Sequence, residues 1–350
     1  MSEIPLTGLA LVVLLGTLVF FHEAGHFTLA KLLKIRVEEF AFGLGPKIIR
    51  LFTRGETEYT IHAIPFGGLV KLAGMEPGDE SVPNGFQSKS AWKRLLVILA
   101  GPIMSFVLAY LIFCTLGLTV GLPTGQAVNR VDLVQPRSRA DIAGLREGDV
   151  IVKINYERIE SGKEMIDIIH SSLGKPLDIT VDRNHHSVVI HATPGPGKIG
   201  KETVGLLGFA PAQKLQRVGL GESVRVGNNA TFVFAKTIVE VLFSREVKEA
   251  VGGPLAIVDA TRTSVRRGLN GYLQLAGILS LSLGVGNLLP IPVLDGGWVM
   301  LLAVEAIRRK RLSPQTWEIA MRVGLTVIVT IVVLVMYLDL GRMAAGKLFR

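Results

Sequence analysis

Four stretches of this 350-residue chain are long and apolar enough to cross a lipid bilayer as helices. A bilayer core needs roughly 20 apolar residues in helical form. The expected spans cover residues 4–33, 95–120, 272–307 and 317–340. Hydrophobic residues make up 49% of the chain, and a mean hydropathy of +0.44 is high for a soluble protein. The sequence therefore predicts a polytopic α-helical membrane protein with about four transmembrane helices.

Polar residues and prolines mark the ends and breaks of these spans. The first span continues into FHEAGHFTLAKLL without the small-residue cleavage site of a signal peptide, so we predict that it is retained. Trp92, Lys93 and Arg94 are expected to anchor the second span at the membrane interface. Pro290 and Pro292 break the third span near its middle, because proline lacks the backbone N–H that a helix needs.

The segments between the spans divide the chain into four parts. Residues 35–91 contain many glycines and short runs of alternating apolar and polar residues, which predicts β-hairpins. The predicted parts are an N-terminal membrane part at 1–120, a soluble insert at 121–211, an amphipathic connector at 212–270 and a C-terminal membrane part at 271–350.

The net charge of +9 does not indicate nucleic-acid binding. Lys and Arg stand between apolar blocks, which is typical of residues that flank membrane spans. Basic residues within 35–91 and the run 308–311 place both loops in the cytoplasm, so both termini and the long insert face outward. The single cysteine, Cys114, excludes an intrachain disulfide and a cysteine-based zinc site.

The first span contains His22-Glu23-Ala24-Gly25-His26, an HExxH pattern. Four helical residues rise about 6 Å and return nearly to the same face, so both imidazoles can reach one zinc ion. Glu23 can accept a proton from zinc-bound water. A solvated helix face would explain so short a motif more simply, but an ionisable group at the centre of a membrane span costs about 2.5–3.5 kcal/mol. We predict a zinc site with His22 and His26 as ligands and Glu23 as general base.

Asp295 is the expected third ligand, because a catalytic zinc ion takes three protein ligands and leaves one position open. This residue also interrupts an apolar span, in NLLPIPVLDGGWVM. Gly296 and Gly297 beside it allow another helix to approach closely. An aspartate that caps a kinked helix is the alternative interpretation.

Several further residues are candidates for substrate binding. Asn287, about two turns before Asp295, could hydrogen-bond the substrate backbone or a developing oxyanion, or equally a neighbouring helix. The other candidates are Gly67 and Gly68 in the hairpin segment and Pro290 and Pro292 in the third span. The remaining histidines have no ligand spacing within a span.

With HEAGH in the first span and NLLPIPVLDGG in the third, the chain resembles the site-2 protease family of intramembrane zinc metalloproteases. FGLGPKI at 42–48 and PFGGLVKLAGM at 65–75 match the membrane-reentrant β-hairpins of that family, and AGPIMSF at 100–106 matches its second core span. The family usually has asparagine where this chain has Ser105, which can still hydrogen-bond across helices. The resemblance covers essentially the whole chain and implies a zinc endopeptidase.

The soluble insert resembles a PDZ domain. ADIAGLREGDVIVKIN at 140–155 matches the PDZ core, and GLLGFAP at 205–211 resembles the carboxylate-binding strand of a permuted PDZ domain. Such a groove adds an extended peptide to a sheet edge and can receive a terminal carboxylate. A generic spacer is the alternative interpretation of this segment.

By resemblance, the substrates are transmembrane proteins already trimmed by another protease, such as anti-sigma factors or signal-peptide remnants. The PDZ domain would then sense the trimmed end or act as a size filter. The resemblance also implies the bacterial inner membrane, with the active site toward the cytoplasm and the PDZ domain outside. Because a helix must unwind before cleavage, we expect residues 66–72 to hold the unwound substrate by edge pairing.

Two other functions are compatible with parts of the pattern. A non-catalytic PDZ receptor could use a structural zinc ion, but such a site takes four protein ligands and needs no general base. A metal transporter also has ionisable residues within its spans, but the chain has no matching hydrophobic halves. The sequence therefore favours the enzyme. The connector is expected either to lie on the outer membrane face or to pack against the bundle.

Overall fold

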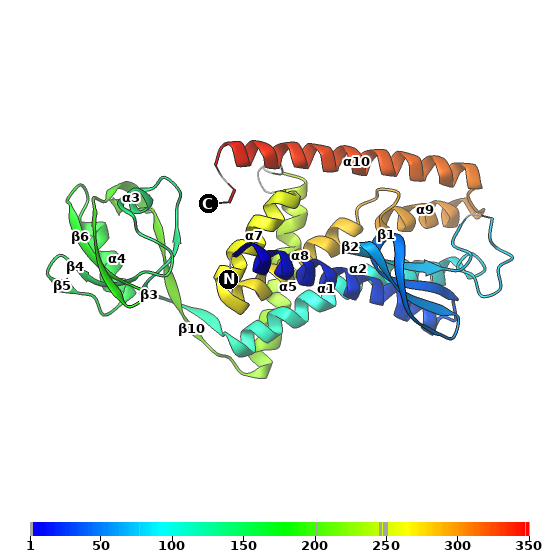
Figure 1. Cartoon of the computed structure of the whole chain (residues 1–350), viewed down its shortest axis with the longest axis horizontal. Coiled ribbons are helices and arrows are strands. Elements are labelled where there is room, and N and C mark those ends of the chain that lie inside the picture. The colour runs from blue at the N-terminus through cyan, green and yellow to red at the C-terminus, as the bar shows by residue number, and fades with distance from the viewer. Residues whose placement is uncertain are drawn as a thin grey trace. The chain divides into compact units, whose positions relative to one another are not determined.

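The computed structural model describes residues 3–76, 78–199, 202–244, 247, 251–346 and 348–349. The chain forms two compact units, one made of Met1–Leu118 and Gly219–Arg350 and the other of Thr119–Val218. The second unit is inserted into the sequence of the first, between two of its helices (Figure 1).

Four helices of the described residues are long and apolar enough to cross a membrane. They are α1 (Glu3–Leu32), α2 (Ala91–Thr119), α8 (Gly268–Asn287) and α10 (Pro314–Ala344). The prediction of four apolar spans is therefore confirmed. A cluster of buried apolar side chains joins the first three of these helices: Leu14, Leu18, Leu108 and Ala276.

The third span differs from the prediction of one broken helix over 272–307. Helix α8 ends at Asn287, and a separate helix, α9 (Asp295–Arg308), follows. Between them the Leu294 N–H donates to the Ile291 carbonyl over 3.0 Å, which closes a tight turn around Pro292. Proline cannot donate a backbone hydrogen bond, so the chain leaves the helix here and starts a new one.

The predicted β segment is confirmed as two long, bent strands, β1 (Val37–Arg54) and β2 (Thr57–Leu72). Phe40 of β1 pairs with both Val70 and Tyr59, so the start of β1 lies between the two ends of β2. The end of β2, residues 68–72, therefore forms one edge of this sheet. In Figure 1 the sheet lies beside α1.

Helices α1 and α2 approach each other closely at Gly25. A Cβ atom at this position would overlap the Ala100 carbonyl group of α2. Small residues allow such contacts in membrane bundles, where dispersion and hydrogen bonds rather than the hydrophobic effect hold helices together. The glycine of HEAGH thus sets the distance between the helix that carries the histidines and its neighbour.

Arg94 does not act as an interfacial anchor, in contrast to the prediction. Its residue exposure is only 3%, and its guanidinium donates to the carboxylate of Glu305 over 3.0 Å. Trp92, two residues earlier, is exposed. The basic cluster at the start of α2 therefore divides into an exposed part and one buried, paired arginine.

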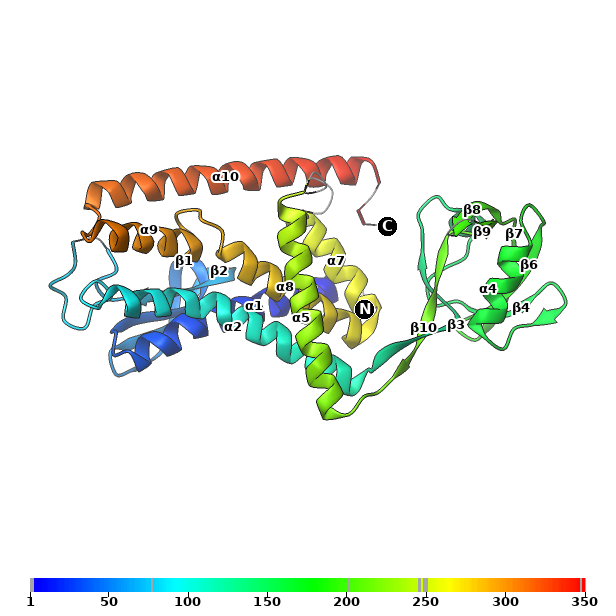
Figure 2. The same ribbon diagram turned by 180° about the vertical axis from the view of Figure 1, so that it is seen from behind.

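The predicted connector forms two helices of the membrane unit, α5 (Leu220–Leu242) and α7 (Pro254–Arg266). Both cross the direction of α2 and α10 (Figures 1 and 2). One face of α5 packs against α2 and α8, while Phe232 and Val239 on another face are exposed. Residues 245–246 and 248–250 of the predicted connector lie outside the described residues.

A buried carboxylate joins α7 to the last span. Asp339 of α10 accepts hydrogen bonds from the backbone N–H groups of Gly253, at 3.2 Å, and Ala256, at 3.0 Å. Free N–H groups at the start of a helix favour such a negative partner. This contact accounts for a fully buried aspartate within an apolar helix.

Among the described residues, the inserted unit contains two antiparallel sheets. The larger has the strand order β10-β3-β4-β6-β7, with β5 paired to β4, and the smaller consists of β8 and β9. The core of the unit is a single cluster of buried apolar residues, and the buried Asp149 forms an ion pair with the partly exposed Arg183 at 2.8 Å. The elements are β3 (Leu122–Val134), α3 (Arg139–Ala143), β4 (Val150–Ile154), β5 (Glu157–Arg158), α4 (Gly162–Ser171), β6 (Leu177–Arg183), β7 (His186–Ala192), β8 (Gly195–Ile199), β9 (Glu202–Leu206) and β10 (Phe209–Gln216).

Candidate metal centre

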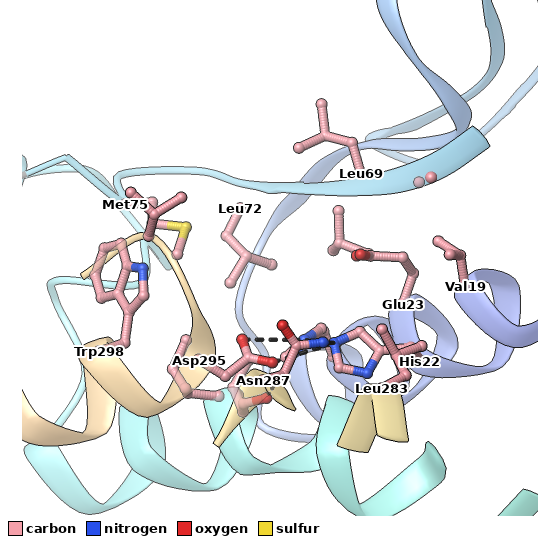
Figure 3. Close-up of a pocket in the computed structure, with 17 residues that line it drawn as sticks. Val19, His22, Glu23, Leu69, Leu72, Met75, Leu283, Asn287, Asp295 and Trp298 are labelled. Carbon is pink, nitrogen blue, oxygen red and sulfur yellow. Dashed lines mark hydrogen bonds and ion pairs between the residues drawn. The ribbon is translucent and has the colours of Figure 1, made fainter. Parts of the chain in front are cut away.

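Two histidines and one aspartate converge inside the helical bundle. Helix α1 presents His22 and His26 on one face, with their Nε2 atoms 3.4 Å apart. Asp295, the first residue of α9, brings Oδ2 to 3.1 Å from His22 Nε2 and Oδ1 to 3.4 Å from His26 Nε2 (Figure 3). Within the described part of the chain, this is the one group of three or more His, Cys, Asp or Glu side chains close enough to share a metal ion.

The second nitrogen of each imidazole has its own hydrogen-bond partner on α2. His26 Nδ1 lies 2.8 Å from the Val97 carbonyl oxygen, and His22 Nδ1 lies 3.0 Å from Ser105 Oγ. A carbonyl oxygen only accepts, so Nδ1 of His26 donates this hydrogen bond, and in the neutral ring its Nε2 then presents a lone pair. Metal-binding histidines in proteins are oriented by this type of outer contact.

Gly101 of α2 leaves the space in which these nitrogen atoms meet. A Cβ atom at this position would overlap His26 Nε2 and lie 2.8 Å from His22 Nε2. The Nε2 atoms of His22 and His26 and the carboxylate of Asp295 thus face one small volume. Two nitrogens and one oxygen form a common donor set for catalytic zinc. The residues present therefore fit a zinc ion with one position left open for water or substrate.

The centre opens into a cavity of about 360 Å³. Glu23 lines it beside the two histidines, with Asn287 Nδ2 3.4 Å from His22 Nε2. In Figure 3 the strand that carries Leu69 passes over Glu23. The remaining walls are mainly apolar and come from α1, α2, α8, α9 and β2, including Val19, Leu72, Leu283 and Trp298. A carboxylate and an open metal position thus share one largely apolar chamber.

The candidate substrate-binding residues divide into two sets. Asn287, Gly67 and Gly68 line the cavity, whereas Pro290 and Pro292 are not among its lining residues. A Cβ atom at Gly68 would lie 2.9 Å from Glu23 Cγ, so glycine allows the strand to pass close to the carboxylate.

Val293 lines the cavity in the turn that the two prolines build. Its φ is 95°, which β-branched residues rarely adopt. Such strained positions cluster at functional sites. No sequence signal indicated this residue, because a valine does not predict a left-handed turn position.

A sequence model of the family described as "Peptidase family M50" matches residues 10–331. The chain belongs to this family. The resemblance to site-2 proteases is therefore confirmed, and the M50 peptidase is a zinc metalloendopeptidase and a multi-pass membrane protein.

Curated relatives align with nearly the whole length of this M50 peptidase. "Zinc metalloprotease RasP" of Bacillus licheniformis is 30% identical over 421 residues, which cover 96% of this chain and 99% of the relative. "Regulator of sigma-W protease RasP" of Bacillus subtilis is 30% identical over 423 residues, with the same coverage. "Putative zinc metalloprotease CPE1693" of Clostridium perfringens is 34% identical over 330 residues, which cover 93% and 96%.

The contact between Ser105 and His22 gives a first testable prediction. Ser105→Ala removes the partner of His22 Nδ1, so the ring is less well oriented and zinc affinity should fall about 10- to 100-fold. Competition with a chromogenic chelator measures this affinity in the purified protein. Ser282→Ala is the matched control, because Ser282 Oγ donates to Ile278 O of its own helix. Equal zinc affinity in both variants would show that the Ser105 contact does not contribute to zinc binding.

Proposed function

We propose that this M50 peptidase hydrolyses peptide bonds in transmembrane segments, with zinc held by His22, His26 and Asp295 and with Glu23 as general base. The observation that carries this proposal is the convergence of two imidazole Nε2 atoms and one carboxylate beside Glu23, within a cavity of the helical bundle. The decisive experiment measures cleavage and zinc content in Glu23→Gln. This variant should lose cleavage and keep its zinc.

A bound zinc ion supplies Lewis acidity, which polarises a carbonyl group and lowers the pKa of a coordinated water toward about 7. Glu23 removes a proton from the attacking water and later delivers it to the leaving amine nitrogen. Asn287 lines the same cavity as Glu23 and can donate its amide N–H to the carbonyl oxygen of the substrate as negative charge develops. The apolar walls limit the water around these charges, which strengthens each interaction.

The free edge of β2 is the proposed site for the unwound substrate. In the described residues, segment 68–72 has its strand partner on one side only, in β1. Gly68 also brings this strand against Glu23. An extended peptide added to this edge would gain backbone hydrogen bonds next to the catalytic carboxylate, and these would replace the bonds that its own helix loses.

Val70→Pro tests the edge-pairing proposal, because the Val70 N–H points away from β1 toward Glu23 and neighbouring N–H groups alternate between the two sides of a strand. Proline removes one backbone N–H from the strand, so cleavage of a transmembrane substrate should fall strongly while the zinc content stays at the wild-type level. Val70→Ala keeps the N–H and only shortens the side chain, which makes it the matched control. Cleavage by detergent-purified protein is the measurement. If the proline variant cleaves as fast as the alanine variant, the substrate does not pair with this edge.

We also propose a role for each of the other parts of the chain. We propose that the insert at 121–211 is a PDZ domain that receives peptide termini, and that the strands of 35–91 re-enter the membrane. Exposed apolar side chains on β1, such as Ile48, Ile49 and Phe52, support contact with lipid. We place 1–120 and 271–350 as the two membrane parts and 212–270 as the connector.

The proposed location is the bacterial inner membrane, with the metal centre toward the cytoplasm and the insert outside. Basic residues in 35–91 and 308–311 support this orientation by the positive-inside rule. The proposed substrates are membrane proteins trimmed by another protease. The relative named "Regulator of sigma-W protease RasP" supports anti-sigma factors as one class, with signal-peptide remnants as another.

A further inference from the structure

A second polar cluster lies between α2 and α9, outside the cavity of the metal centre. Arg94 near the start of α2 donates to Glu305 Oε2 near the end of α9 over 3.0 Å, and both side chains are buried, with exposures of 4% and 6%. Neither residue lines the cavity. Burial of two full charges costs solvation free energy, so a buried pair by itself is weak evidence for stabilisation. Another role for the pair must therefore be considered.

The cluster is held by directional hydrogen bonds on both sides. Arg94 also donates to Gln87 Oε1 over 2.9 Å, and Glu305 Oε1 accepts the backbone N–H of Leu312 over 3.1 Å. The Gln87 side chain donates in turn to the carbonyl of Met75, a residue that lines the cavity. Apolar packing between two helices tolerates small slides and rotations, whereas these directional bonds lengthen and bend when α9 shifts on α2.

The metal centre and the Arg94–Glu305 ion pair contact α9 at different points. Asp295 stands at the first residue of α9 and Glu305 ten residues later, about 15 Å along the helix axis. On α2, Arg94 precedes Gly101 by seven residues, about 10 Å. One contact leaves a helix free to pivot, but two separated contacts fix both its position and its rotation. The ion pair thus defines where the first turn of α9 lies relative to the histidines.

We propose that the Arg94–Glu305 ion pair is a positioning device that sets Asp295 in register with His22 and His26. This inference rests on the proposed metal ligands, and neither Arg94 nor Glu305 touches zinc or substrate. Loss of the pair should therefore change the metal centre itself, beyond any change in overall stability.

The test uses the full-length protein in detergent with added Zn²⁺ or Co²⁺. Glu305→Gln keeps the shape of the side chain and removes its charge. We expect zinc affinity to fall by no more than the roughly 10- to 100-fold typical of groups that contact a metal ligand directly, and the visible absorption of the Co²⁺-loaded protein to change. Asp339→Asn is the matched control, because it neutralises another buried carboxylate that joins α10 to α7. It should lower the melting temperature while zinc affinity and the Co²⁺ spectrum stay as in wild type.

Arg94→Lys is the second variant and preserves the buried positive charge. Lysine lacks the planar fork that reaches both Glu305 and Gln87, so zinc affinity should fall here too, by a smaller factor. Wild-type zinc affinity and an unchanged Co²⁺ spectrum in both Glu305→Gln and Arg94→Lys would overturn the positioning role. Asp295→Ala, measured in parallel, separates the two proposals. If it binds zinc as tightly as wild type, the proposed ligand set fails. If only it loses zinc, the positioning role alone fails.

Discussion

Glu23→Gln is expected to lower the cleavage rate of a transmembrane substrate by about 10²- to 10⁴-fold, the usual contribution of a positioned general base. Glutamine has nearly the same shape but cannot accept the proton of the attacking water. The proposed zinc ligands are the two imidazoles and Asp295, not the Glu23 carboxylate. The zinc content should therefore stay near one ion per chain. Cleavage in detergent and metal content of the same preparation are the two measurements.

The outcomes separate the enzyme from a receptor with a structural zinc ion. Retained zinc with lost cleavage agrees with Glu23 as the base. A variant that still cleaves at the wild-type rate would exclude that role. If neither wild type nor Glu23→Gln cleaves any transmembrane substrate while both bind zinc, the non-catalytic receptor becomes the better explanation.

Gly101→Ala should weaken zinc binding strongly. The added methyl group would overlap His26 Nε2 and approach His22 Nε2 to 2.8 Å, so at least one ligand must move. We expect zinc affinity to fall by about 100-fold or more, the upper end for changes around metal ligands, and cleavage to fall with it. Chelator competition on the purified protein measures the affinity.

The control for this substitution is Gly8→Ala in α1. A Cβ atom there would meet no atom within 4 Å, so the same chemical change has no steric cost. Alanine is also the better helix former. Gly8→Ala should therefore keep wild-type zinc binding with equal or slightly higher stability. Tight zinc binding by Gly101→Ala would mean that the Nε2 atoms of His22 and His26 do not lie next to Gly101.

The spans and the three converging side chains could be predicted because their signals are local or nearly so. Hydropathy gives the length of each apolar helix, and the spacing of His22 and His26 places both rings on one helical face. Asp295 could be recognised because an acidic residue within an apolar span needs a partner. Each inference needs only a short window of sequence.

Other features depend on which surfaces meet in three dimensions. The role of Gly101 follows from the turn of α2 that faces the histidines. Arg94 has its partner 211 residues away, so its neighbours Trp92 and Lys93 suggested an interfacial position instead. The turn before Asp295 places Val293 at a φ that favours glycine, against its local preference. Tertiary packing overrides the local signal in all three cases.

X-ray absorption at the zinc edge tests the central claim most directly, because it reports the atoms bound to the metal. The wild-type spectrum should fit two imidazole nitrogens at about 2.0–2.1 Å and oxygen donors at about 2.0–2.2 Å. Asp295→Ala should bind zinc weakly or give an altered oxygen shell. A sulfur donor at about 2.3 Å, or a spectrum unchanged in Asp295→Ala, would contradict a centre built from His22, His26 and Asp295.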